Sequence, residues 1–97
     1  MQKKAYISPC KQYRYFLSRI WDAEKPLLLF IGLNPSTADA KQDDPTIRRC
    51  IGFAKSWGYG GFYIGNLFAY RTAYPTELRK APEPIGPQND RWLKKLA

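Results

Sequence analysis

The sequence predicts an α/β domain built on a parallel sheet. Two apolar runs without polar alternation, at residues 27–33 and 62–70, indicate strands that are buried on both faces, as in sheets covered by helices. Residues 45–57 between them have the period of an amphipathic helix. Strand, helix and strand in this order form a βαβ unit, so we expect residues 27–33 and 62–67 to be adjacent parallel strands.

The remaining elements follow from local signals. Residues 13–21 alternate between apolar and polar positions, which indicates a strand, and "DAEKP" then turns the chain. The central helix has an N-cap at Asp44, proline at its first position and Gly58 as its stop signal. Its predicted apolar face consists of Ile47, Cys50, Ile51, Ala54 and Trp57.

A long connection and a final helix complete the prediction. Residues 71–90 contain four prolines and one glycine, so we expect a loop there with at most a helical turn at 75–80. A helix is predicted to begin at Asn89, and the sequence ends within it. We therefore expect residues 1–97 to form one α/β domain that is either partial or naturally shortened.

The charge of the chain favours a polyanionic partner, and its composition argues against a membrane protein. Lysine and arginine number 16 against 8 acids, giving a net charge of +8, which suits a polyanionic partner such as nucleic acid. The alternative is an ordinary solvated basic surface. No apolar run is long enough to span a bilayer and the N-terminus lacks a secretory apolar region, so a cytoplasmic protein without a membrane partner is expected.

Histidine is absent from the sequence, which removes most zinc-site patterns and every Ser-His or Cys-His catalytic pair. Cys10 and Cys50 lack the CxxC spacing, and without a secretory signal we expect reduced thiols. Asp39 and Asp43 could hold magnesium through oxygen ligands, but two loosely spaced acids are weak evidence. We therefore predict no metal and no cofactor.

Polar residues follow both predicted buried strands. In an open parallel sheet, ligands bind beyond the carboxyl ends of the strands, so both sets should meet in one cleft. Asparagine can contact a base edge and arginine a phosphate. The alternative is ordinary turn chemistry, with the arginines on a solvated face. The predicted ligand-binding residues are Gly32, Pro35, Ser36, Thr37, Asn66, Tyr70 and Arg71, and the predicted phosphate-binding residues are Arg14, Arg48 and Arg49.

Several runs resemble a known family. "LNPSTAD", "DDPTIRRC", "NLFAYR" and "PIGPQND" are similar to those of the domain of unknown function family 1643 of bacteria and phages, over about residues 14–96. This resemblance implies no established activity. It does imply relatives that are longer than this chain and that carry a late His-Pro segment.

A more distant resemblance is to the uracil-DNA glycosylase superfamily. Gly32–Pro35 match its "GxNP" motif, and residues 66–71 resemble a neighbouring strand end. The resemblance implies a three-layer αβα sandwich with a mainly parallel sheet, here truncated at the C-terminus. It also implies that Asn34, alone or with Asp39, positions an attacking water. Superfamily members close this site with a later His-containing motif, whereas this chain has no histidine.

Three functions are consistent with these observations. The first is a nucleotide- or nucleic-acid-binding domain without complete catalytic machinery. The second is a hydrolase of N-glycosidic bonds to a nucleobase, with Asn34 and Asp39 as its catalytic residues. The third is a phage or mobile-element accessory protein that binds another protein, or a second copy of itself, through an exposed sheet edge.

Overall fold

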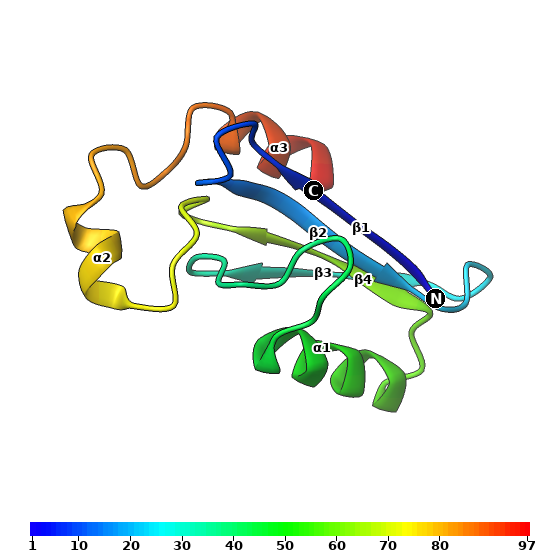
Figure 1. Ribbon diagram of the computed structural model, residues 1–97. Helices are drawn as coiled ribbons and strands as arrows, with labels where there is room; N and C mark the ends of the chain where they lie inside the picture. The colour runs from blue at the N-terminus through cyan, green and yellow to red at the C-terminus, as the bar shows by residue number, and fades with distance from the viewer.

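One sheet with a helix against each face organises the chain (Figure 1). The computed structural model describes residues 1–97 apart from the side chain of Pro75. The elements are β1 (Gln2–Ile7), β2 (Arg14–Ile20), β3 (Leu27–Gly32), α1 (Pro45–Ser56), β4 (Gly61–Asn66), α2 (Pro75–Lys80) and α3 (Asn89–Leu96).

The sheet is mixed, with strand order β1-β2-β4-β3. β3 and β4 are parallel neighbours, with Leu28 opposite Phe62, so the expected βαβ unit is confirmed. The pairings of β1 with β2 and of β2 with β4 are antiparallel. The predicted mainly parallel three-layer αβα sandwich is therefore wrong, because only one pair of strands is parallel and few helices accompany the sheet.

The antiparallel part of the sheet begins with β1, which the sequence analysis missed. Only residues 8–13 join β1 to β2, and a parallel pair would need a crossover of about a dozen residues or more. In β1, Lys3, Ala5 and Ile7 are half-buried, whereas Lys4 and Tyr6 are exposed. This alternation is short and rich in lysine, so the sequence indicated only a basic surface.

β3 lies at an edge of the sheet, and the expectation that it is buried on both faces is wrong. Leu28 and Phe30 pack against the core, but Leu29 and Ile31 on the other face are 37% and 51% exposed. β4 is central and buried, as expected. An unbroken apolar run therefore identified two strands correctly but did not distinguish the edge from the centre of the sheet.

α1 covers one face of the sheet and encloses the core, which contains Leu17, Ala38, Ile47, Cys50, Ala54, Phe62 and Ile64. Asp44 caps the helix as predicted, with its carboxylate accepting from the Ile47 amide. The periodicity predicted that Trp57 lies on the buried face of the helix, and this prediction is wrong. Trp57 lies beyond the last turn of the helix, is 58% exposed and stacks on Phe53.

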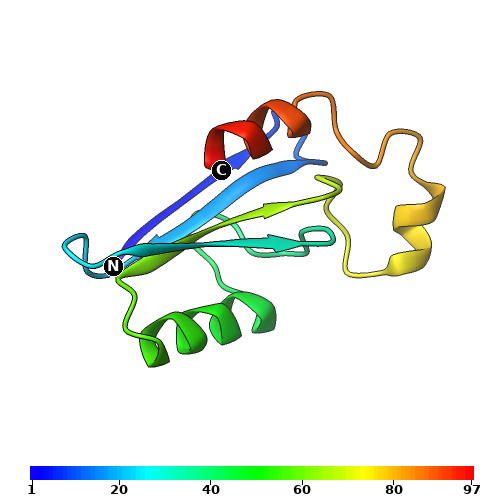
Figure 2. The same cartoon turned by 180° about the vertical axis from the view of Figure 1, so that it is seen from behind.

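α3 covers part of the opposite face (Figure 2). Gly65 of β4 allows this close approach, because a Cβ atom there would lie 2.9 Å from the Leu93 side chain and 3.1 Å from that of Leu96. α2 lies beyond the end of the sheet, within the long connection where a helical turn was expected (Figure 1). No helix in the described part of the chain is long and apolar enough to cross a membrane.

Candidate functional site

The carboxyl ends of β3 and β4 meet at one edge of the sheet, where Gly32 lies opposite Asn66. The two segments that follow remain side by side, since the amide of Leu67 donates to the carbonyl of Gly32 over 3.0 Å. A cavity of about 120 Å³ opens there, and we call it the strand-end cavity. It is lined by residues of β2, β3, β4, the loop after β3 and the start of α1, namely Arg14, Gly32, Leu33, Asn34, Pro35, Ser36, Asp44, Thr46, Ile47, Ile64 and Asn66.

Asn66 is the last residue of β4 and is 3% exposed. Its Oδ1 atom is buried and has no hydrogen-bond partner in the described part of the chain. Its amide group lies over Gly32, where an added Cβ would come within 2.8 Å of Nδ2. Glycine at position 32 therefore leaves room for the Asn66 side chain at the cavity wall.

Arg14, at the start of β2, is 2% exposed. Its Nη1 donates to the carbonyl of Ala38 over 3.0 Å, while its buried Nε has no partner among the described residues. Burial lowers the pKa of Arg14 to about 10, and the charge of Asp44 opposes this shift. Arg14 is thus still protonated at neutral pH, so the cavity wall holds a buried cation with an unused donor.

Asn34 joins the loop after β3 to the segment after β4. Its Nδ2 donates to the carbonyls of Thr72, over 2.9 Å, and of Pro35, over 3.1 Å. These bonds occupy the donors of the amide and leave its oxygen for other contacts. Asn34 therefore lines the cavity, but it also holds the two strand-end segments together.

The loop after β3 is organised around Arg19, which contacts one of its acids and two of its backbone carbonyls. This arginine on β2 is fully buried, and its Nε donates to the carboxylate of Asp43 over 2.8 Å. Its Nη2 donates to the backbone carbonyls of Asp39 and Gln42. Lys3 of β1 adds a second ion pair to Asp43, at 3.3 Å. One buried cation on a strand thus fixes the course of the loop, a role that the sequence analysis missed.

The other two acids of this loop also have structural partners. Asp39 accepts hydrogen bonds from the amides of Lys41 and Gln42, both over 2.8 Å. Asp44 accepts from the amides of Ala38 and Ile47. All three carboxylates therefore have local partners, and this arrangement does not favour magnesium binding by Asp39 and Asp43.

These contacts predict a loss of stability in acid. Hydrogen bonds from the amides of Gln42 and Lys41 lower the pKa of Asp39. Burial raises the pKa of Asp43, but the hydrogen bonds and charges of Arg19 and Lys3 outweigh that effect and lower it. A carboxylate with a lowered folded-state pKa stabilises the fold fully above its unfolded pKa, about 3.9, and this contribution is lost as the pH falls through the folded value.

We therefore expect the free energy of unfolding, measured with urea, to fall more steeply below about pH 4 in the parent chain than in Asp39→Asn. Glu24→Gln is the control, because Glu24 is an exposed acid in the turn before β3. An equal acid loss in the parent chain and in Asp39→Asn would contradict this role for Asp39.

Several predicted site residues lie outside the cavity lining. Arg71 donates to the carbonyls of Thr37 and Lys11, over 3.4 and 3.3 Å, and so binds backbone beside the cavity. Arg48 and Arg49 are exposed on α1, away from the lining. The predicted residues that do not line the cavity are Thr37, Asp39, Arg48, Arg49, Tyr70 and Arg71, whereas Arg14, Gly32, Asn34, Pro35, Ser36 and Asn66 do.

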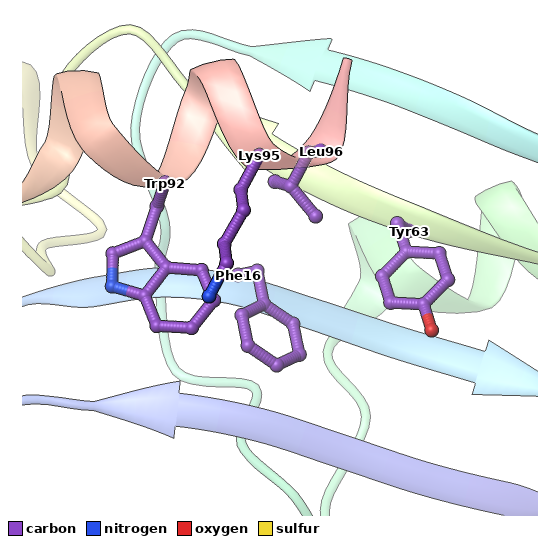
Figure 3. A pocket seen from close by; sticks show the side chains of 5 residues that line it. All are labelled: Phe16, Tyr63, Trp92, Lys95 and Leu96. Carbon is purple, nitrogen blue, oxygen red and sulfur yellow. The ribbon is translucent and has the colours of Figure 1, made fainter.

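A second, larger hollow of about 300 Å³ lies between α3 and the sheet (Figure 3). Trp92, Lys95 and Leu96 descend from α3 toward Phe16 and Tyr63 on the central strands. The Lys95 ammonium lies 5.1 Å from the centre of the Trp92 ring. Tyr63 is therefore part of an open aromatic surface.

The two cysteines should differ in reactivity. Cys10 is exposed, and the Ser8 hydroxyl, 3.2 Å from its sulfur, is the largest influence that lowers its pKa. Cys50 is buried in the core, where burial raises its pKa. Because the thiolate is the reactive form, we expect a thiol-specific reagent to label Cys10 in the native chain and Cys50 only after unfolding. Equal labelling rates in the native chain would contradict the placement of Cys50.

Together, the fold and the site define a small α/β domain with a cavity at the carboxyl edge of its parallel strand pair, lined by both polar and apolar side chains. The chain belongs to the family described as protein of unknown function (DUF1643), whose model matches residues 14–97. The match begins with Arg14 and so covers every residue that lines the cavity. Comparison with curated proteins found no match, and neither did comparison with solved structures. The resemblance to the uracil-DNA glycosylase superfamily stays a prediction, and the mixed sheet differs from the parallel sandwich that it implied.

Proposed function

We propose that this chain is a nucleotide- or nucleic-acid-binding domain that contacts a base in the strand-end cavity. The observation that carries the proposal is a pair of buried polar atoms, Arg14 Nε and Asn66 Oδ1, on residues that line one cavity. Neither atom has a hydrogen-bond partner among the residues that the structure describes. One is a donor and the other an acceptor. Leaving such a buried group unpaired costs about 1–3 kcal/mol, which a ligand that pairs with it recovers.

Nucleobase edges suit such a pair, because they present neighbouring donors and acceptors. The cavity, at about 120 Å³, is small, so we expect it to take a base while the sugar and phosphate stay outside. Asn34 and Ser36 add polar groups to its wall. The net charge of +8 favours a partner that also carries phosphates.

The test is calorimetric titration at low salt with nucleoside monophosphates covering the common bases and with single-stranded oligonucleotides. Asn66→Ala removes an acceptor that has no partner in the described part of the chain, so we expect it to fold normally and to bind about tenfold more weakly. Gly32→Ala is a second variant, since its Cβ displaces the Asn66 amide. Gln2→Ala, which removes an exposed side-chain amide on β1, is the matched control.

Two results would contradict the proposal. One is the absence of binding to every nucleotide and oligonucleotide at low salt. The other is binding that Asn66→Ala and Gln2→Ala weaken equally, because the contact would then lie elsewhere on the basic surface.

The placement of Asn34 and Asp39 does not favour catalysis by this pair. Asn34 has its amide donors on backbone carbonyls, and Asp39 does not line the cavity with it. Asp39 is instead held by the amides of its own loop. This geometry does not favour a shared water between the two residues.

We therefore expect no release of free base from uracil- or mismatch-containing oligonucleotides. The measurement is incubation with the purified chain followed by alkali, which breaks the strand at abasic sites. Strand breaks that disappear in a folded Asn34→Ala variant would show that the site is catalytic.

A further inference from the structure

We propose that two copies of this chain associate through β3, which pairs antiparallel with β3 of the second copy and joins the two sheets into one. Within the part of the chain that the structure describes, β3 is hydrogen-bonded to β4 on one side and forms an edge of the sheet. Its outer side presents backbone N–H and C=O groups that another strand can bind. This association is independent of ligand binding in the strand-end cavity.

The two edges of the sheet differ in their protection. Natural edge strands avoid unwanted pairing through lysine, proline, bulges or covering segments. β1, at one edge, carries Lys3 and Lys4 and has a register shift between Tyr6 and Ile7. β3, at the other edge, has no charge or proline and pairs with β4 without a register shift. The edge at β3 therefore lacks these protections.

Exposed aliphatic side chains accompany this free edge. Leu27, Leu29 and Ile31 on one face of β3 are 40%, 37% and 51% exposed, and Leu33 just beyond it is 55% exposed. α3 covers the neighbouring strand β4 at Gly65 but leaves these side chains open. Covering them with apolar surface is favourable by roughly 25 cal/mol per Å².

The absence of charge at this edge suits an uncharged strand better than a polyanion. Residues 26–38 contain no charged side chain, so β3 offers no cation to a phosphate. Although the net charge of each copy is +8, pairing of the two β3 strands brings no charged side chains of these residues together. The matching occupant is an uncharged, apolar, extended strand with a free edge, and β3 of the second copy is such a strand.

A two-fold axis at Leu29 satisfies this geometry. Antiparallel pairing with Leu29 opposite Leu29 of the second copy places Leu27 opposite Ile31, so all these side chains share one face. A six-residue strand is about 20 Å long, and with side chains on both faces the contact buries on the order of 800 Å². That area is typical of a weak interface, so the dimer should form in a concentration-dependent manner.

The first test is sedimentation velocity over a wide concentration range. We expect the parent chain to shift from monomer to dimer, Ile31→Lys to stay monomeric, and Phe53→Lys to behave like the parent chain. Phe53 is the matched control because it is 50% exposed on α1, away from β3. A parent chain that is monomeric throughout, or a dimer that Ile31→Lys leaves intact, would overturn the proposal.

The second test does not require a charged variant to fold. Leu29→Cys is made in a Cys10→Ser background, and diamide oxidises one thiol from each copy to a single disulfide. Directly opposed residues in an antiparallel pair have Cα atoms about 4.5–5.5 Å apart, within the range of disulfides. We expect a covalent dimer from Leu29→Cys and none from Phe53→Cys in the same background. No covalent dimer, or equal amounts from both variants, would overturn the pairing.

Discussion

Asp43→Ala is expected to lower the free energy of unfolding by about 3 kcal/mol, because it leaves a buried cation without its partner. Arg19 is fully buried and donates from Nε to Asp43 over 2.8 Å. The backbone carbonyls of Asp39 and Gln42 remain as acceptors but carry no full charge. The measurement is urea unfolding at neutral pH, followed by circular dichroism.

A double-mutant cycle separates the ion pair from general disruption of the loop. Replacing both partners, as in Arg19→Met with Asp43→Ala, removes the unpaired charge, so the double variant should lose less stability than Arg19→Met and Asp43→Ala together. Additive losses would show that Arg19 and Asp43 act independently, contrary to the contact between them.

Phe62→Ala is expected to lower the free energy of unfolding by about 3–5 kcal/mol. Phe62 on β4 is fully buried and packs edge-on against Phe30, with ring centres 5.5 Å apart, and against Trp21. Its removal leaves a cavity where the parallel strand pair meets α1. Phe53→Ala is the matched control, since that ring is 50% exposed, and a small loss is expected there. Equal losses in the two variants would contradict the assigned core.

The sequence was sufficient for the elements whose signals are local. Asp44 and Pro45 marked the start of α1, and two unbroken apolar runs marked the parallel strands on either side of it. The mixed sheet was not predictable in the same way, because pairing of β2 with β4 depends on contacts distant in sequence. β1 was missed for a different reason, since its alternation includes two lysines.

The candidate site was predictable where it depends on topology. Gly32, Asn34 and Asn66 meet because parallel strands end at the same edge of a sheet. The internal role of Arg19 was not predictable, since an arginine in an alternating strand normally faces solvent. Only the fold shows that Arg19 donates to the carboxylate of Asp43 and to the backbone carbonyl of Asp39.

The most direct test of the binding proposal is a ¹H–¹⁵N NMR titration with nucleoside monophosphates. It follows the Nε–H signal of Arg14 and the side-chain amide signal of Asn66, which belong to residues that line the strand-end cavity. We predict that at least one nucleotide shifts both signals with the same saturation curve, while the exposed side-chain amide of Gln2 stays unchanged. Nucleotides that leave both signals in place, or that shift only surface lysines and Gln2, would contradict ligand binding in this cavity.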